Sequence, residues 1–215
     1  MALATHPAES DLYLPDLDDG TLWDPMTIFT HCSLLSIPEA AISVFLYLRC
    51  LPAFRMSQGG ISVFQGLDNP ANDSGVAYLD YRDTAPWPTV DGNTITLANG
   101  LRMEFLELGR VLRLTYTSPD GKTSLDVAQT AITDLFARGH IIPGEDKDSD
   151  PARKPGGSEQ FMRADGVLVL HGKRFDVNST DCRDRSWSQV RSESANIAGQ
   201  PPVCWTPMHF GDHLI

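Results

Sequence analysis

The sequence predicts an all-β protein, built as an antiparallel barrel or sandwich with few short helices. Runs rich in β-branched and aromatic residues recur along the chain, and in residues 101–107 Leu101, Met103 and Phe105 alternate with polar residues and share one face. Turn-forming pairs such as Asn99-Gly100 separate these runs. Strands joined by tight turns run antiparallel, and such strands close into a barrel or stack as a sandwich.

The predicted strands follow one another through short connections. A hairpin over residues 167–177 turns at His171-Gly172. Asn99-Gly100 predicts a type I′ turn, in which both central residues have positive φ. Gly59-Gly60 is interpreted as a bend before a strand. The other predicted strands cover residues 41–51, 61–65, 76–82, 94–98, 101–107 and 111–117.

Two segments raise the question of helix. Asp24-Pro25 predicts the start of a short helix that extends to about Ser36, because proline is favoured in the first helical turn. Residues 126–138 are ambiguous, since Val127, Ala131 and Leu135 fit a helical face while the threonine content fits a strand. A strand is favoured for the first half of that segment.

The chain divides into three parts by composition. Residues 1–24 are interpreted as an N-terminal extension, residues 25–198 as the β domain, and residues 199–215 as a separate C-terminal segment. Residues 137–158 predict a mobile surface loop, because their proline, glycine and charged residues bury little apolar surface; a lid over a cavity is the alternative. The apolar residues 205–215 predict either a final docked strand or an exposed edge that favours self-association.

Charge and length bound the partners. The 215 residues carry 28 acidic and 17 basic side chains, a net charge of -11, which disfavours nucleic acid and anionic membranes. The apolar run 40–51 contains Arg49 and is too short to cross a bilayer, so no membrane insertion is predicted. The N-terminus does not resemble a signal peptide, and the cysteines are widely spaced; both favour a cytoplasmic protein with reduced thiols.

Residues 183–191 concentrate charge beside a predicted hairpin. They contain Arg183, Arg185 and Arg191 together with Asp184 and a tryptophan. Because buried charges must be paired, this density predicts a polar site inside an apolar β structure. Strand alternation places Arg183 and Arg185 on one face with Trp187, and places Asp184 on the other face with Ser186. Arg183, Arg185, Arg191 and Ser186 are the candidate ligand-binding residues.

Three residues of this region are candidates for catalysis. Asp184 is the candidate general acid, since a carboxyl in an apolar cavity has a raised pKa; an ion-paired strand end is the alternative. Trp187 would stabilise a developing cation through its ring face, or it is an aromatic core anchor. Glu159 pairs with Arg183 or Arg191, or it supplies a second carboxylate for acid–base work. The sequence leaves these alternatives open.

The sequence predicts neither a metal nor a cofactor. His209 and His213 have the spacing of a helical metal site, but Pro207 and Gly211 argue against a helix there and no third ligand is evident. The chain also contains no glycine-rich nucleotide-binding motif.

The residues Glu159-Gln160, Gly166 and Arg183-Asp184-x-Ser186-Trp187-Ser188 carry a family resemblance. This pattern resembles the lipocalin-like hydroxyneurosporene synthase superfamily, which includes carotenoid hydratases and AttH-type proteins. The resemblance implies two consecutive lipocalin- or calycin-like β barrels. This chain would supply the first, and residues 199–215 would be the start of the second.

The resemblance also implies a function. It implies a cofactor-independent lyase or isomerase of the hydratase type that acts on a hydrophobic terpenoid, steroid or polyketide-like molecule. Two alternatives stay open: a non-catalytic binding or carrier protein for such a molecule, and an inactive half of a two-domain protein. The surroundings of Asp184 would distinguish catalysis from a structural role.

Overall fold

The computed structural model describes residues 6–66, 75–137, 156–190, 209–210 and 213–214. Within these residues, twelve strands form one antiparallel sheet. Its order is β4-β3-β2-β1-β12-β11-β9-β8-β7-β6-β5, with β10 paired to the end of β11, and a separate small hairpin joins β13 to β14. The strands are β1 Thr27–Ile37, β2 Ile42–Leu51, β3 Met56–Gln65, β4 Val76–Pro86, β5 Thr89–Asp91, β6 Thr94–Thr96, β7 Arg102–Glu107, β8 Val111–Thr117, β9 Ser124–Ala131, β10 Phe136–Ala137, β11 Gly156–Leu170, β12 Lys173–Val190, β13 His209–Phe210 and β14 His213–Leu214.

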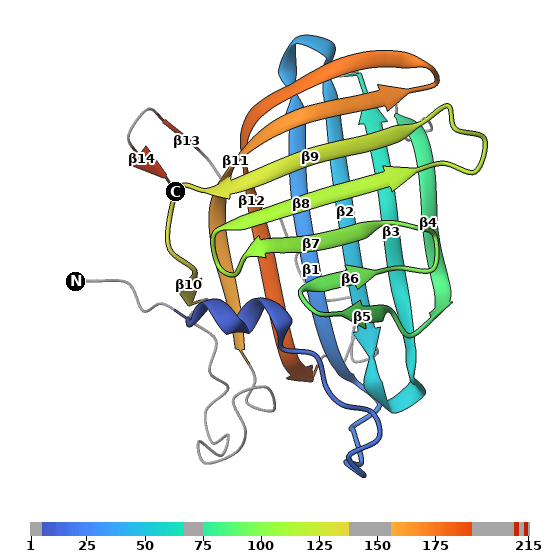
Figure 1. The fold of residues 1–215 in the computed structure, drawn as a ribbon, viewed down its shortest axis with the longest axis vertical. Coiled ribbons are helices and arrows are strands. Elements are labelled where there is room, and N and C mark those ends of the chain that lie inside the picture. Colours follow the sequence, from blue (N-terminus) through green and yellow to red (C-terminus); the bar gives the residue numbers. More distant parts are fainter. Residues whose placement is uncertain (1–5, 67–74, 138–155, 191–208, 211–212, 215) are drawn as a thin grey trace, which may run out of the picture.

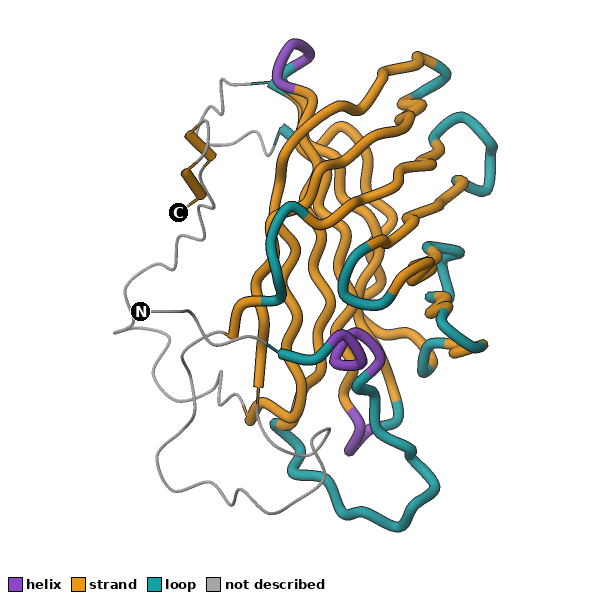
Figure 2. Tube along the Cα trace, turned by 60° about the vertical axis from the view of Figure 1, so that its left-hand side comes forward, coloured by secondary structure: helices purple, strands orange, loops and turns teal. Residues whose placement is uncertain are grey.

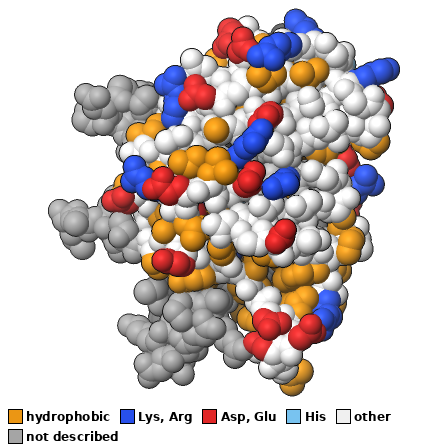
Figure 3. All heavy atoms as spheres, in the orientation of Figure 1, with side chains coloured by type: hydrophobic (Ala, Val, Ile, Leu, Met, Phe, Trp, Pro, Cys, Tyr) orange, Lys and Arg blue, Asp and Glu red, His pale blue; other side chains and the backbone are white. Residues whose placement is uncertain are grey.

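The sheet curls strongly into a half-barrel. In Figure 1, β12 and β1 to β4 run vertically at the back, while β9 to β5 cross in front of them, and β11 connects the two halves. Figure 2 shows the same curl from the side. The all-β, antiparallel fold predicted from alternation and turns is therefore confirmed, and the curled half-barrel is consistent with the lipocalin-like class that the family resemblance implies. Figure 3 shows charged side chains of both signs scattered over one face, with apolar side chains gathering in its lower part.

The core fills the space between the two halves of the sheet. Phe29 and Leu46 on one half and Met103, Phe105 and Leu114 on the other are almost completely buried and belong to one apolar cluster. In β8 every second residue is buried and the residues between them are half-buried or exposed, as expected for a strand with one face toward the core. Because large side chains from both halves meet here, burial of their apolar surface stabilises the curled sheet.

Short 3-10 helices are the helical elements of the described residues. They are η1 Ala8–Leu12, η2 Pro38–Ala40 and η3 Pro52–Phe54. The helix predicted from Asp24 to about Ser36 is wrong, because Thr27–Ile37 forms β1. The Asp24 carboxylate accepts a hydrogen bond from the backbone N–H of Met26 at 2.7 Å and its carbonyl accepts one from Thr27 at 2.9 Å, so this residue makes a turn instead of a helix cap.

Two glycine predictions also need correction. Gly59 and Gly60 lie inside β3, not before it, with φ of +143° and +144°. At the Asn99-Gly100 turn only Gly100 has positive φ, so the turn is not type I′; the Leu97 carbonyl accepts from the Gly100 N–H instead. The type I′ geometry occurs at His171-Gly172, where both residues have positive φ between paired Leu170 and Lys173.

The structure describes only parts of residues 126–138 and of the predicted loop 137–158. The predicted strand in the first half of residues 126–138 is confirmed by β9, and β10 follows at Phe136–Ala137. Most of the predicted loop 137–158 lies outside the described residues. Its last part, from Gly156 to Ser158, is the start of β11 and pairs with β12, so the loop prediction is wrong for these residues.

No helix in the described part of the chain combines the length and the apolar character needed to cross a bilayer.

Candidate functional site

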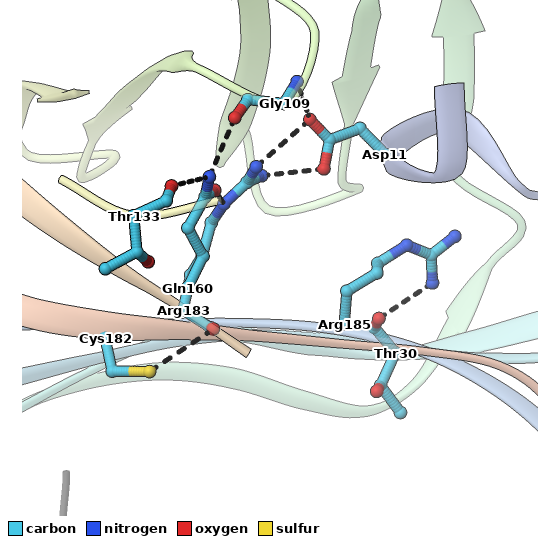
Figure 4. Close-up of polar contacts among 8 residues, drawn as sticks. All are labelled: Asp11, Thr30, Gly109, Thr133, Gln160, Cys182, Arg183 and Arg185. Atoms are coloured by element: carbon cyan, nitrogen blue, oxygen red, sulfur yellow. Dashed lines mark hydrogen bonds and ion pairs between the residues drawn. The ribbon is translucent and has the colours of Figure 1, made fainter. Parts of the chain in front are cut away.

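Arg183 lies at the centre of a buried polar network on the inner face of β12. Its guanidinium binds both carboxylate oxygens of Asp11, at 2.8 and 3.1 Å, and its Nε donates to Gln160 at 2.7 Å. Figure 4 shows both partners above the strand, with Asp11 reaching in from η1. The Arg183 side chain is 6% exposed and that of Asp11 is 1% exposed. The predicted pairing of a site guanidinium with a carboxylate is confirmed, and the partner of Arg183 is Asp11 instead of Glu159. The alternative partner for Glu159, Arg191, lies outside the described residues.

The network ties three separate segments together. Asp11 accepts a hydrogen bond from the backbone N–H of Gly109 in the β7–β8 turn at 2.7 Å. The Gln160 amide donates to the carbonyls of Gly109 and Thr133, each at 2.8 Å. The donors of Arg183 and the oxygens of Asp11 are therefore engaged in structural bonds. These contacts fix η1 and two turns against β11 and β12.

Arg185 lies two residues further along the same face and is buried differently. It is 2% exposed, and its Nη1 donates to the carbonyl of Thr30 at 2.8 Å and to that of Ser186. Its Nη2 donates to the Tyr13 carbonyl at 2.5 Å. Within the described residues no carboxylate forms an ion pair with it. Burial lowers the pKa of Arg185 to about 10, although the guanidinium stays charged at neutral pH.

Trp187 is packed as an aromatic anchor. It is 2% exposed and belongs to the core cluster. The rings of His6 and Tyr13 meet it edge-on, with centroid distances of 4.8 and 5.4 Å, and the Arg185 guanidinium lies 6.0 Å from its centroid. A Cβ at Gly156 would lie only 2.4 Å from the ring. Neighbours on several sides leave little room for a substrate cation against this ring.

Asp184 belongs to the opposite face of β12, as strand alternation predicts. It is directly opposite Glu159 on β11 and Cys32 on β1. Figure 4 shows the neighbouring Cys182 pointing away from the side of Arg183, and its thiol approaches Glu159 at 3.5 Å. Burial, reinforced by the nearby carboxylates, raises the pKa values of the Cys32 and Cys182 thiols. The structure thus places the two predicted carboxylates directly opposite each other, on the face of β12 that is opposite to Arg183 and Arg185.

The other predicted site residues divide between described and undescribed parts. Ser186 is fully buried, and its carbonyl is an acceptor for Arg185. Arg191 lies outside the described residues. His209 and Phe210 form β13, and His213 and Leu214 form β14, so the expectation that His209 and His213 do not share a helix is confirmed.

A pocket lies away from the arginines of β12, beside the N-terminal segment. We define the N-terminal segment as residues 6–18. The volume of the pocket is about 540 Å³. Walls come from the N-terminal segment, from Arg55 after η3, and from the connection between β4 and β5. Arg55 donates to the carbonyl of Leu17 at 3.2 Å and to the carboxylate of Asp18 at 2.6 Å. The lining residues are Leu12, Leu14, Pro15, Asp16, Leu17, Asp18, Arg55, Trp87, Pro88 and Val90.

Sequence reasoning did not identify the pocket or Asp11. The pocket draws on three segments that are far apart in the chain, and no local motif marks them. Asp11 is separated from Arg183 by 172 positions. The available signal was indirect: an acid flanked by Leu12, Tyr13 and Leu14 in a segment interpreted as an extension.

The hydrogen bonds and ion pairs of the side chains on β12 and in the pocket decide which chemistry each place can support. The inner face of β12 carries charges that are held by structural bonds. The opposite face brings two carboxylates and two thiols of raised pKa together. The pocket presents mainly apolar side chains with one ion pair. Of these three places, the pocket is the one with space of the size that a small molecule needs.

Comparison with known proteins gives little further guidance. No family model and no curated protein matches the chain. One solved structure to which it is similar is a protein provisionally named AttH from Nitrosomonas europaea, with 13% sequence identity and a TM-score of 0.33. The likeness covers 85% of this chain and 60% of that chain, so this chain spans less than two thirds of the neighbour's length. A likeness at this level carries no weight for function, which has to be inferred from the chain's own residues.

Proposed function

We propose that this protein binds a small hydrophobic molecule without chemical change, as a carrier or binding protein. The single observation that carries the proposal is the pocket of about 540 Å³ beside the N-terminal segment. Its volume falls within the roughly 300–1,000 Å³ range of small-molecule sites. A ligand of terpenoid, steroid or polyketide-like size matches this volume and the apolar walls.

The arrangement of the walls supports an apolar ligand with one polar group. Leu12, Leu14 and Trp87 pack against the core on one side, so they form a fixed surface on which a ligand can bury apolar area. Arg55 and Asp18 form an exposed ion pair among the lining residues, with side chains 58% and 81% exposed. Such charges can hold a hydroxyl or carbonyl of a ligand while its body lies against the apolar wall.

Binding without chemistry is favoured over catalysis because none of the predicted catalytic residues lines the pocket. Trp187 is enclosed by His6 and Tyr13, and Asp184 faces away from the buried arginines. A general acid has to lie within hydrogen-bond reach of the group it protonates. The lining carboxylates Asp16 and Asp18 are exposed to solvent instead of being enclosed by the apolar wall.

A fluorescence titration with the neutral apolar probe N-phenyl-1-naphthylamine tests this proposal. We expect saturable binding to the full chain, and we expect Val90→Arg to weaken it at least tenfold by placing a charge on the apolar wall. Leu106→Arg is the matched control, because Leu106 is 56% exposed, Val90 is 49% exposed, and only Val90 lines the pocket. Equal binding by both variants, or no saturable binding, would rule the pocket out.

A second candidate is a cofactor-independent lyase or isomerase of the hydratase type. Its support is the direct opposition of Glu159 and Asp184 across β11 and β12, since paired carboxylates can divide acid and base roles. Incubation with a cell lipid extract, followed by mass spectrometry, distinguishes the two candidates. Molecules that gain or lose the mass of water with the wild type, but not with Asp184→Asn, would favour the lyase. Molecules retained unaltered by both proteins would favour the carrier.

A further inference from the structure

Three polar side chains form a row across the inner face of the sheet. Arg185 on β12 is directly opposite His31 on β1 and directly opposite Ser158 on β11. Residues that are directly opposite on neighbouring strands share one face, with Cβ atoms about 4.5–5.5 Å apart. All three are buried, with exposures of 6% for His31, 2% for Arg185 and 1% for Ser158.

Each member of this row has a buried polar atom without a hydrogen-bond partner among the described residues. These atoms are His31 Nε2, Arg185 Nε and Ser158 Oγ. Each can donate a hydrogen: the guanidinium through Nε–H, the serine through its hydroxyl, and a neutral imidazole through the tautomer protonated at Nε2. Buried donors of this kind are normally satisfied, and neighbouring orphaned donors indicate a shared acceptor.

The charge balance indicates that this acceptor is an anion. Asp11 is bound by both Nη atoms of Arg183, which leaves Arg185 with backbone carbonyls for acceptors. His31 adds no negative charge, and burial together with the two arginines lowers its pKa, which keeps it neutral. The nearby thiol of Cys50 is also neutral, because burial raises its pKa to about 12. Asp184 lies on the opposite face of the strand, and both Asp184 and Asp11 act on Arg185 only through space. Among the described residues, the Arg185 guanidinium is therefore buried with no carboxylate bonded to it directly.

We infer that Arg185, His31 and Ser158 form an interior binding site for a small monovalent anion of halide size. Water could accept the three hydrogen bonds, but it would not balance the buried guanidinium, whose desolvation is costly without an opposite charge. The close packing around the row, with Phe105 beside His31 and Trp187 beside Arg185, favours a compact anion over a larger carboxylate ligand. This site is separate from the pocket, and none of its three residues lines that pocket.

Bromide soaking of crystals of the full chain locates the site directly. Data collected at the bromine absorption edge are expected to show an anomalous peak within hydrogen-bond reach of Arg185 Nε and Ser158 Oγ. Peaks at surface positions alone, or electron density that refines as water at the row, would overturn the inference. This measurement uses the wild-type protein, so it does not depend on any variant folding.

Thermal unfolding in solution gives an independent test. At equal ionic strength, potassium chloride is expected to raise the midpoint of unfolding above that in potassium gluconate, because an anion bound to the folded state stabilises it. Ser158→Ala is expected to weaken the apparent chloride affinity about tenfold, through loss of one donor. Arg185→Met should abolish the chloride effect, whereas the exposed control Arg113→Met should retain it. A chloride effect equal in wild type and Ser158→Ala would contradict the site.

Discussion

Two buried arginines on one strand, Arg183 and Arg185, satisfy their charge in different ways. Arg183 forms an ion pair with both oxygens of one carboxylate, and that carboxylate has a further backbone donor. Arg185 relies on backbone carbonyls. Desolvation of a guanidinium is costly in either case, so its partners decide whether the fold tolerates it. The density of charge in residues 183–191 therefore has a structural explanation before any catalytic one.

Removal of the Asp11 charge should destabilise the fold strongly. Asp11→Asn leaves Arg183 buried without a counter-charge, which typically costs about 3–5 kcal/mol. Urea unfolding of the full chain measures this loss. Asp126→Asn is the matched control, because Asp126 also forms a two-point pair with an arginine, Arg113, but at the surface. Equal losses in the two variants would show that the buried pair is not essential.

His31 should make stability depend on pH. Burial lowers its pKa in the folded state well below 6.5, so the unfolded chain binds a proton that the folded chain does not. Stability is then unaffected above pH 6.5 and falls as the pH decreases below that value. Stability at pH 5.5 should therefore be lower than at pH 7.5, by roughly 1 kcal/mol for one such histidine.

Urea unfolding of wild type and His31→Gln at the two pH values tests this. The variant should lack that part of the pH dependence, whereas the contribution of His6, whose pKa is also lowered by burial, is common to both proteins. The same pH dependence in both proteins would show that His31 is protonated equally in the folded and unfolded states.

At the scale of elements, the curl of the sheet depends on close approach of strands at glycine. A Cβ at Gly60 would lie 2.0 Å from the backbone oxygen of Asp80 on β4, and its φ of +144° is one that only glycine adopts readily. The same holds for Gly59 against Tyr47 on β2, at 2.1 Å. These two residues allow β3 to approach both of its neighbours.

Gly60→Ala should therefore destabilise the protein by about 3 kcal/mol or more, from backbone strain and a clash that no side-chain rotation relieves. Gly20→Ala provides the control, since Gly20 also has positive φ, at +80°, but has open space around it. Its cost should be about 1–2 kcal/mol. Thermal or urea unfolding of both variants would decide, and similar losses would contradict the role assigned to close strand approach.

How far the elements could be predicted depended on whether their signals were local. Most strands between residues 42 and 131, and the hairpin at residues 167–177, followed from alternation and turn residues, which act over a few positions. β5 and the first half of β11 did not. Residues 27–37 were mistaken for a helix because Asp24-Pro25 is typical of both a helix start and a turn, and burial between two neighbouring strands decides for β1. Gly156 looked like loop composition, but a residue without a Cβ is needed beneath Trp187.

The candidate site was less predictable than the fold, for a physical reason. The faces of Arg183, Asp184 and Arg185 followed from strand alternation. Their partners did not, because Asp11 comes from a segment far away in sequence and meets Arg183 only after the sheet has curled. The pocket likewise requires the N-terminal segment, η3 and the β4–β5 connection to converge. Such convergence is a property of the tertiary fold.

At the scale of the whole molecule, the N-terminal segment connects the two regions of interest. Asp11 and the Tyr13 carbonyl bind the interior arginines, while the neighbouring Leu12 and Leu14 line the pocket. One side of this segment therefore satisfies buried charge and the other presents an apolar surface. In this account the network of Arg183 and Asp11 has a structural role, Arg185 belongs to the proposed anion site, and the pocket is the site of the hydrophobic ligand.

Backbone NMR spectra of the full chain, recorded during titration with N-phenyl-1-naphthylamine, test this division most directly. We expect saturable shifts at the amides of the pocket, including Leu14, Arg55 and Val90, with the amides of Gln160 and Arg183 nearly unchanged. Shifts concentrated on β11 and β12 around Arg183, Arg185 and Trp187, with the pocket amides unaffected, would contradict the account and place the ligand inside the half-barrel.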